Sequence, residues 1–205
     1  MTGIMGERLT VLNDDRLGHL RSIVRNRLRD LAGRAGTGSF DEFFDSTMRA
    51  LVVDCFQSIG AHEGTVWLLD ESRNYLIPRF NTGPNAASFV GRFRQSVRAG
   101  MISMIVSTEL PLCENEVSKN QQQDKSLDQK LGLQTCAMLA TPLYFAGELR
   151  GVISAVQLRP PNSTDPEPPG FSPRHLETLQ LTATVLARLI EQQLLSLAIG
   201  LEELT

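Results

Sequence analysis

Apolar residues follow a helical period at both ends of the chain and a strand-like pattern between them. From Glu7 to Leu31, leucines and a valine recur at threes and fours with arginines and aspartates between them. From Ser172-Pro173 to about Leu197, an N-cap serine and a proline at the first helical position open a second such pattern. Both spacings predict long amphipathic helices. The last helix has more apolar residues than one stripe needs, so we expect part of it to pack on the domain and part on a partner chain.

A glycine-rich joint, residues 33–39, is expected to end the first helix. Ser39 and Glu42 match a capping box, in which the two side chains cap the free amides at a helix start. The sequence therefore predicts a further helix from Ser39 to about Ile59, with its apolar residues broadly on one face.

After Gly60 the period changes to that of strands. Residues 65–69 and 75–80 are apolar runs joined by a polar stretch, which predicts a hairpin. Pro78 has no N–H for a ladder, so we expect the second strand to lie at an edge or to carry a bulge there. Residues 88–97 alternate weakly and are interpreted as a third strand.

The next segment changes from apolar to strongly polar. Residues 101–106 are too apolar for a surface loop and predict a short helix packed over the sheet. Residues 115–130 form the most polar part of the domain and include three consecutive glutamines. They predict a loop that runs into a short helix near residues 125–131.

Residues 138–158 contain two apolar runs separated by Ala146-Gly147-Glu148. The glycine suits a tight turn, and the run from Val152 to Val156 is rich in β-branched residues that suit a buried strand. This pattern predicts a β-hairpin at the core of the domain. The proline-rich stretch after it, residues 159–170, predicts a surface loop.

The length, net charge and apolar content of the chain argue against several classes of function. A chain of 205 residues is expected to hold one domain with helical extensions. The net charge of −3 gives no basic excess, which argues against nucleic acid as a partner. No leader or apolar run long enough for a membrane span occurs, so we expect no membrane association and a cytoplasmic location.

The cysteines and histidines, which often supply catalytic or metal-binding groups, form no such motif in this sequence. The three cysteines, Cys55, Cys113 and Cys136, are odd in number and widely spaced, which argues against a disulfide framework and a zinc site and fits a reducing compartment. The three histidines show neither a metal-ligand spacing nor a triad. We therefore predict no catalytic residue and no metal site, and no motif names a cofactor.

Four phrases, in order, resemble the GAF domain family of small sensor modules in signalling proteins. They are GTVWLLDESRNYL, SVRAGMISMIVSTELPL, MLATPLYFAGELRGVISAVQL and GFSPRHLETLQLTATVLARLIE, and the resemblance runs from Phe40 to about Gln193. The family's "G-x-L-x-G-V-I" strand matches Gly147 to Ile153, whereas Glu109 replaces the glycine usual before Pro111.

The resemblance implies an α+β, GAF-like and PAS-related fold: a central antiparallel sheet of five or six strands flanked by helices, with long terminal helices. It implies a helical extension and joint at residues 1–38, the GAF domain at 39–197 and a tail at 198–205. A small-molecule pocket would lie opposite the terminal helices, roofed by residues 101–130. By position in the family pattern, the predicted ligand contacts are Arg94 and Arg98 for an anionic group, Met101, Ser103, Met104 and Ser107 in the roof, and Thr135 near the floor.

Known ligand classes of this family match poorly. Cyclic-nucleotide binders carry Asn-Lys after the last strand, where this chain has Gln157-Leu158, and of the rest of their signature only the phenylalanine, Phe171, remains. None of the cysteines precedes a histidine, as a bilin attachment site requires.

The leading expectation is therefore a non-catalytic regulatory domain that binds a small ligand, forms a homodimer through its terminal helices, or does both. Two alternatives remain open at this point. One is a free methionine sulfoxide reductase acting through Cys113 and Cys136. The other is a structural dimerisation module without a ligand.

Overall fold

The computed structural model describes residues 15–34, 40–164 and 166–199. One six-stranded antiparallel sheet organises it, with strand order β3-β2-β1-β6-β5-β4. The strands are β1 (Glu63–Leu69), β2 (Tyr75–Asn81), β3 (Gln95–Ser96), β4 (Leu112–Glu114), β5 (Gln134–Phe145) and β6 (Glu148–Arg159). The predicted fold class, including a sheet of five or six strands, is confirmed.

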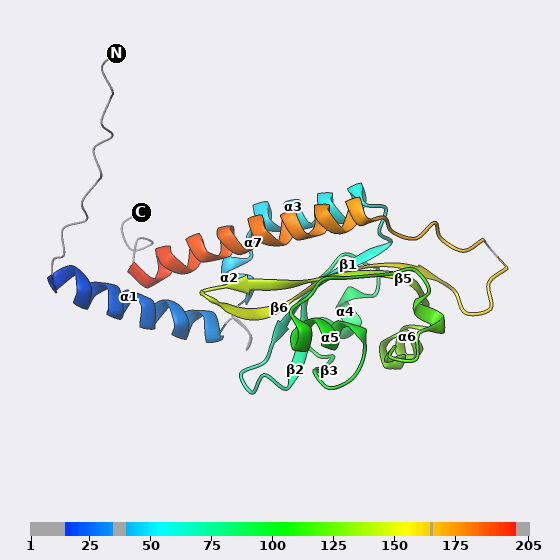
Figure 1. The fold of residues 1–205 in the computed structure, drawn as a ribbon, viewed down its shortest axis with the longest axis horizontal. Helices are drawn as coiled ribbons and strands as arrows, with labels where there is room; N and C mark the ends of the chain where they lie inside the picture. Colours follow the sequence, from blue (N-terminus) through cyan, green and yellow to red (C-terminus); the bar gives the residue numbers. More distant parts are fainter. Residues whose placement is uncertain (1–14, 35–39, 165, 200–205) are drawn as a thin grey trace, which may run out of the picture.

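Helices cover both faces of this sheet (Figure 1). On one face α7 (Pro173–Ile199) and α3 (Ser46–Ser58) lie side by side, next to the short α2 (Phe40–Phe43). On the other face lie the short helices α4 (Ala86–Phe89), α5 (Met101–Thr108) and α6 (Ser126–Leu131), with the 3₁₀ turn η2 (Val117–Lys119) between α5 and α6 in the chain. The predicted roof is therefore present.

The predicted core hairpin is formed by β5 and β6, the two longest strands. Ala146 and Gly147 form its turn with φ values of 53° and 78°. Two successive residues in the left-handed region give the turn a twist that matches the strands, and glycine adopts it without strain. The hairpin then pairs with β1 through β6, which places β6 in the middle of the sheet.

Alternation along the strands separates two apolar clusters. Val66 on β1 and Ile153 on β6 point to the α3 and α7 face, where they pack with Leu179 and Leu186 of α7. Trp67 and Val152, one position along each strand, belong to the cluster under α5 on the opposite face. Because successive side chains of a strand point to opposite faces, one sheet serves both a helix-packed core and a second, partly polar layer.

Two predicted elements differ in the structure. The helix expected from Ser39 is divided into α2 and α3, because Asp45 interrupts it and accepts a hydrogen bond from Met48 N at 2.9 Å as the N-cap of α3. Ser39 itself lies outside the described residues. The expected third strand is reduced to β3, since α4 occupies residues 86–89 and Gly91, at φ 73°, turns the chain before it can pair. Pro78 lies beside a bulge between β1 and β2, as predicted.

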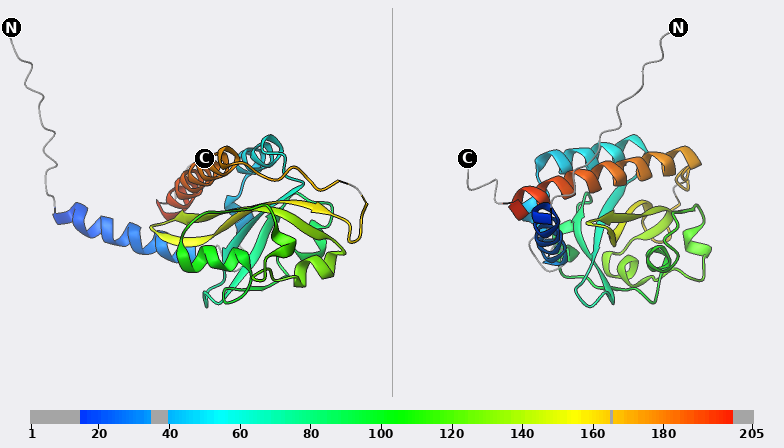
Figure 2. Two further views of the ribbon diagram at one scale, coloured as in Figure 1. Left: turned by 45° about the vertical axis from the view of Figure 1, so that its right-hand side comes forward. Right: turned by 60° about the vertical axis from the view of Figure 1, so that its left-hand side comes forward.

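Helix α1 (Asp15–Arg34) projects beyond the sheet and meets the C-terminal half of α7 (Figure 2). Its first predicted residues, 7–14, lie outside the described part. Leu20 and Ile23 on α1 are 54% and 46% exposed. No helix in the described ranges is long and apolar enough to cross a membrane.

Candidate functional site

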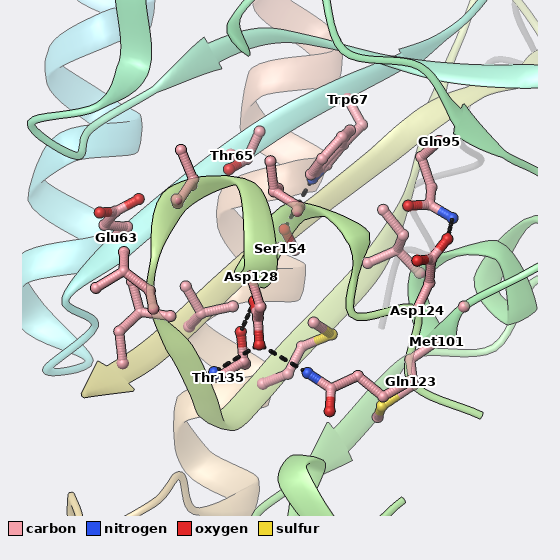
Figure 3. A pocket seen from close by; sticks show the side chains of 18 of the residues that line it. Glu63, Thr65, Trp67, Gln95, Met101, Gln123, Asp124, Asp128, Thr135 and Ser154 are labelled. Atoms are coloured by element: carbon pink, nitrogen blue, oxygen red, sulfur yellow. Dashed lines mark hydrogen bonds between the residues drawn. The ribbon is translucent and has the colours of Figure 1, made fainter. Parts of the chain in front are cut away.

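A cavity of about 80 Å³ lies between the sheet and the helices α4, α5 and α6. A water molecule needs roughly 10–15 Å³ of such space, so the cavity has room for several waters or for one compact ligand. Strands β1, β5 and β6 supply its floor, and the chain from Gly100 to Leu133 supplies most of its roof (Figure 3). This is the location that the sequence predicted for a pocket.

The lining combines an apolar surface with many polar groups. The apolar side chains are those of Phe89, Met101, Ile102, Leu127, Leu131, Leu133, Met138, Val156 and Leu158. The polar side chains, with Trp67, are those of Glu63, Thr65, Asn81, Gln95, Gln123, Asp124, Asp128, Thr135 and Ser154. Ligand sites typically have this composition, in which polar groups orient a molecule held by apolar contacts.

The polar groups of the floor are linked in pairs. The Trp67 indole N–H donates to Ser154 Oγ at 2.9 Å, across the β1–β6 pair. Asn81 Nδ2 donates to Thr65 Oγ1 at 2.9 Å, and Asn81 Oδ1 accepts from the Gly83 backbone N–H at 2.7 Å. Buried polar groups need such partners, so these bonds fix the side chains in the orientation that a ligand would meet.

Asp128 of α6 fastens the roof to the floor (Figure 3). Its carboxylate accepts hydrogen bonds from Thr135 N and Thr135 Oγ1, both at 2.8 Å, and from Gln123 Nε2 at 2.9 Å. Gln95 Nε2 makes a second link, donating to Asp124 Oδ2 at 3.0 Å and to Ala99 O at 2.7 Å. Hydrogen bonds to ionised groups are the stronger kind, so the roof is held chiefly by these two carboxylates.

Glu63 is the first residue of β1. Of the three acidic side chains that line the cavity, it receives the weakest hydrogen bonding. It is only 6% exposed, and among the described residues the hydrogen bond to its carboxylate comes from Asn81 Nδ2, at the long distance of 3.5 Å. Burial raises the pKa of Glu63 above its ordinary value, while the Asn81 hydrogen bond and the nearby His62 oppose this effect. The fold thus disfavours the charged form of this carboxyl group.

We expect Glu63→Gln to stabilise the protein near neutral pH. The raised pKa means that the wild-type group carries no penalty below about pH 4.5, its ordinary pKa, and loses stability as the pH rises through its folded pKa. A gain in Tm of about 3 °C, the shift that roughly 1 kcal/mol produces in a chain of this size, is expected at neutral pH. Thermal melts of both proteins from acidic to neutral pH measure it. A difference that does not grow with pH would contradict this assignment.

Two of the seven predicted ligand contacts line the cavity. Met101 is the first residue of α5 in the roof, and Thr135 is the second residue of β5 at the floor. Ser103 is buried, but its hydroxyl donates to the backbone oxygens of Ser96 and Ala99 and holds the start of α5. Ser103, Met104 and Ser107 border a separate surface hollow together with Arg98.

Arg94 also lies outside the cavity. Its guanidinium pairs with Asp70 Oδ2 at 2.9 Å and stacks over the Tyr75 ring at 4.4 Å. The cavity contains no arginine or lysine among its described lining residues. The anionic group for which Arg94 and Arg98 were predicted therefore has no counterpart in this cavity.

Most of the polar residues that line the cavity were not predicted from the sequence. Glu63, Thr65 and Ser154 occupy every second position along two strands, the positions that face the roof. A signal was present, because polar side chains at inward positions of otherwise apolar strands are costly without a purpose. Asp124 and Asp128 could not be recognised as site residues from the sequence, because they lie in a segment that is polar throughout.

The cysteines do not form a reactive pair. Cys113 on β4 is opposite Leu139 on β5, whereas Cys136 lies three residues earlier on β5, about 10 Å along the strand. A disulfide needs Cα atoms within about 7 Å. Burial also raises the pKa of the Cys113 and Cys136 thiols, which keeps them in the less nucleophilic protonated form. Neither lines the cavity, so the geometry does not favour the reductase chemistry.

Gln157, where cyclic-nucleotide binders have asparagine, is a structural residue here. It is 2% exposed, its Nε2 donates to Gly60 O at 3.0 Å, and its Oε1 accepts from Gly170 N at 2.9 Å. These bonds tie the proline-rich loop to the end of α3. In the described part of the chain, no group of three or more His, Cys, Asp or Glu side chains is placed to hold a metal ion.

Comparison with known proteins agrees with this architecture. A family model described as the GAF domain matches residues 37–191. The GAF domain of a phosphoenolpyruvate-protein phosphotransferase from Coxiella burnetii has a TM-score of 0.61 at 19% identity, covering 91% of this chain and 99% of that chain. The GAF domain of an Acinetobacter phosphoenolpyruvate-protein phosphotransferase has a TM-score of 0.57 at 17% identity, covering 92% and 99%.

An enzyme is also among the similar structures. A type II free methionine-R-sulfoxide reductase from Thermoplasma acidophilum has a TM-score of 0.55 at 17% identity, covering 74% of this chain and 94% of that chain. A comparison with curated proteins found no match. At these identities, similarity to solved structures establishes the fold alone.

Proposed function

Because the chain belongs to the GAF domain family, whose members are typically sensor or regulatory modules of signalling proteins, we propose that it is a non-catalytic sensor. A small molecule occupies the cavity between the sheet and the roof, and the domain passes the binding event to its terminal helices. Met101 and Thr135 are retained as proposed contacts. Glu63, Trp67 and Ser154 are added, because they present polar groups to the same space.

The observation that carries this proposal is the group of polar side chains that line an otherwise apolar cavity. Thr65, Gln95 and Ser154 are each at most 6% exposed, yet none lies in the helix-packed core. In a purely structural module, apolar side chains at these positions would give a more stable domain, since buried polar groups add little net stability. Retaining them in one cavity suits recognition of a polar ligand.

The terminal helices suit a homodimer. On α7 the exposed apolar residues are Leu181, Val185, Leu195 and Ile199. Their spacing, with the exposed Arg188 and Gln192 between them, follows alternating steps of three and four residues, the repeat of a coiled-coil seam. Buried residues such as Leu186 and Ile190 lie on the opposite side, against the sheet. One helix thus contacts the ligand-binding domain and presents a seam for a second copy.

Native mass spectrometry of freshly purified protein tests both parts. We expect a dimer for the wild type, with additional mass from a co-purified small molecule that denaturation releases. Leu181→Glu puts a charge on the seam and is expected to give a monomer that keeps the small molecule. Gln57→Glu, which introduces the same charge at an exposed residue of α3 outside the seam, is the matched control. A monomeric wild type at tens of micromolar, a concentration at which specific homodimers typically persist, would contradict the dimer.

A further inference from the structure

The side-chain nitrogens that line the cavity are already engaged. Trp67 Nε1 donates to Ser154, Asn81 Nδ2 to Thr65 and Glu63, and Gln95 Nε2 to Asp124 and Ala99. Gln123 Nε2 donates to Asp128. Most of the N–H groups on these four nitrogens are therefore occupied, and one N–H of Gln123 Nε2 is left for a ligand.

Acceptors, by contrast, are in surplus. Gln123 Oε1 is buried and has no hydrogen-bond partner. Glu63 is more than nine-tenths buried, and within the described residues its carboxylate receives the long hydrogen bond from Asn81 Nδ2 to Oε2. Because burying an acceptor without a full set of partners is unfavourable, these acceptors favour a ligand that donates hydrogen bonds.

The charges of the lining residues favour the same kind of ligand as the hydrogen bonds do. Glu63, Asp124 and Asp128 line the cavity, and none of its described lining residues is a lysine or an arginine. Asp128 receives three hydrogen bonds and Asp124 two, which satisfies both carboxylates within the roof. Glu63 is left as the acidic group whose compensation is incomplete.

The surroundings of Glu63 are shaped around its carboxylate. A Cβ atom placed on Gly83 would lie 2.0 Å from Glu63 Cδ, so only a glycine lets the chain after β2 pass so close. Gly83 N is meanwhile bound to Asn81 Oδ1, which keeps this segment in place. The carboxylate is thus held at one end of the cavity, with apolar side chains such as Val156 and Leu158 also lining it.

Building on the proposed sensor function, we propose that the ligand is a compact organic cation, a primary ammonium or amidinium on a small apolar body. Its charged group donates to the Glu63 carboxylate. Its apolar body lies against Val156, which is opposite Glu63 on β6. Anionic ligands are disfavoured, because three carboxylates would repel them and no cationic side chain of the lining would offset the repulsion.

Trp67 provides a direct readout, since it is the only tryptophan of the chain and lines the cavity. We would titrate the full-length protein with isobutylammonium, isobutanol and isobutyrate at matched ionic strength and follow Trp67 fluorescence. The three probes share one apolar body and differ in charge. Isobutylammonium is expected to bind at least about tenfold more tightly than either of the others, which corresponds to about 1.4 kcal/mol.

Glu63→Gln should abolish this preference and leave the ammonium probe no tighter than the alcohol. Glu71→Gln, a change at an exposed acidic residue of the β1–β2 turn, is the matched control and should keep the preference. Near-UV circular dichroism checks that both variants retain the wild-type fold.

The outcomes separate the two proposals. Equal or tighter binding of isobutanol or isobutyrate overturns the cation proposal and leaves the sensor function standing. An ammonium preference that survives in Glu63→Gln overturns the role of Glu63 as its counter-ion. If no probe of any charge alters Trp67 fluorescence, the cation proposal is overturned, and the sensor function is decided separately by the co-purified mass in native mass spectrometry.

Discussion

Gly151→Ala is expected to destabilise the domain by about 3 kcal/mol or more, because no space exists for the added methyl group. A Cβ atom at Gly151 would lie 1.9 Å from the backbone oxygen of Trp67 and 3.0 Å from Leu68 Cδ2. β6 is paired on both sides at this point, with Leu68 of β1 and Leu143 of β5. The obstructing atom belongs to the backbone of a central strand, so relief requires the sheet itself to move. Denaturant unfolding followed by Trp67 fluorescence measures the loss.

Gly18→Ala is the matched control for this change. Gly18 lies on α1, and a Cβ atom there meets no heavy atom within 4 Å. Alanine favours a helix over glycine by up to about 1 kcal/mol, so this variant should be unchanged or slightly more stable. If Gly151→Ala retained stability within about 0.5 kcal/mol of the wild type, the close approach of β6 to β1 would be wrong.

Asp128→Ala is expected to cost about 3 kcal/mol and to loosen the roof of the cavity. It removes the acceptor for Thr135 N, Thr135 Oγ1 and Gln123 Nε2 at once. Hydrogen bonds to charged groups contribute about 1.5–3 kcal/mol each, and a buried N–H without a partner adds a penalty. Hydrogen exchange provides a second measurement, since the Thr135 amide should lose much more protection than the amides of α7, whose protection falls only with the global stability.

Two variants calibrate this result. Asp128→Asn keeps one acceptor oxygen without the charge and should give an intermediate loss. Asp54→Ala removes an exposed carboxylate on α3, far from the cavity in the chain, and should stay within about 0.5 kcal/mol of the wild type. A Thr135 amide that remained as protected in Asp128→Ala as in the wild type would show that the roof is held by other contacts.

The fold was predictable wherever a local pattern had only one way to be buried. Residues 138–158 alternate around a turn with glycine at a left-handed position, and they form the β5–β6 hairpin. The apolar stripe that starts at Pro173 is continuous, and it forms α7 on the sheet. The weak alternation over residues 88–97 had no such support, and α4 and the turn at Gly91 replaced most of the expected strand.

The candidate site was predictable only in its location. Met101 and Thr135 line the cavity, because they flank the roof segment that the family pattern identified. Arg94 and Arg98 do not, since the shortened β3 leaves both at the surface, where Arg94 pairs with Asp70. The acidic residues of the cavity come from three separate segments of the chain, and no spacing in the sequence brings them together.

The sequence by itself determined the family, the hairpin core and the helices of this protein, because periodicity and turn residues act over short distances along the chain. Only the tertiary structure decided the character of the cavity. Glu63 at the start of β1 and Asp128 on α6 face the same space because the roof folds back over the sheet. Their burial, the hydrogen bonds that satisfy one and not the other, and the absence of a nearby cation among the described lining residues depend on contacts between distant segments. Those contacts left the cavity lined by acidic side chains, with Arg94 and Arg98 outside it at the surface.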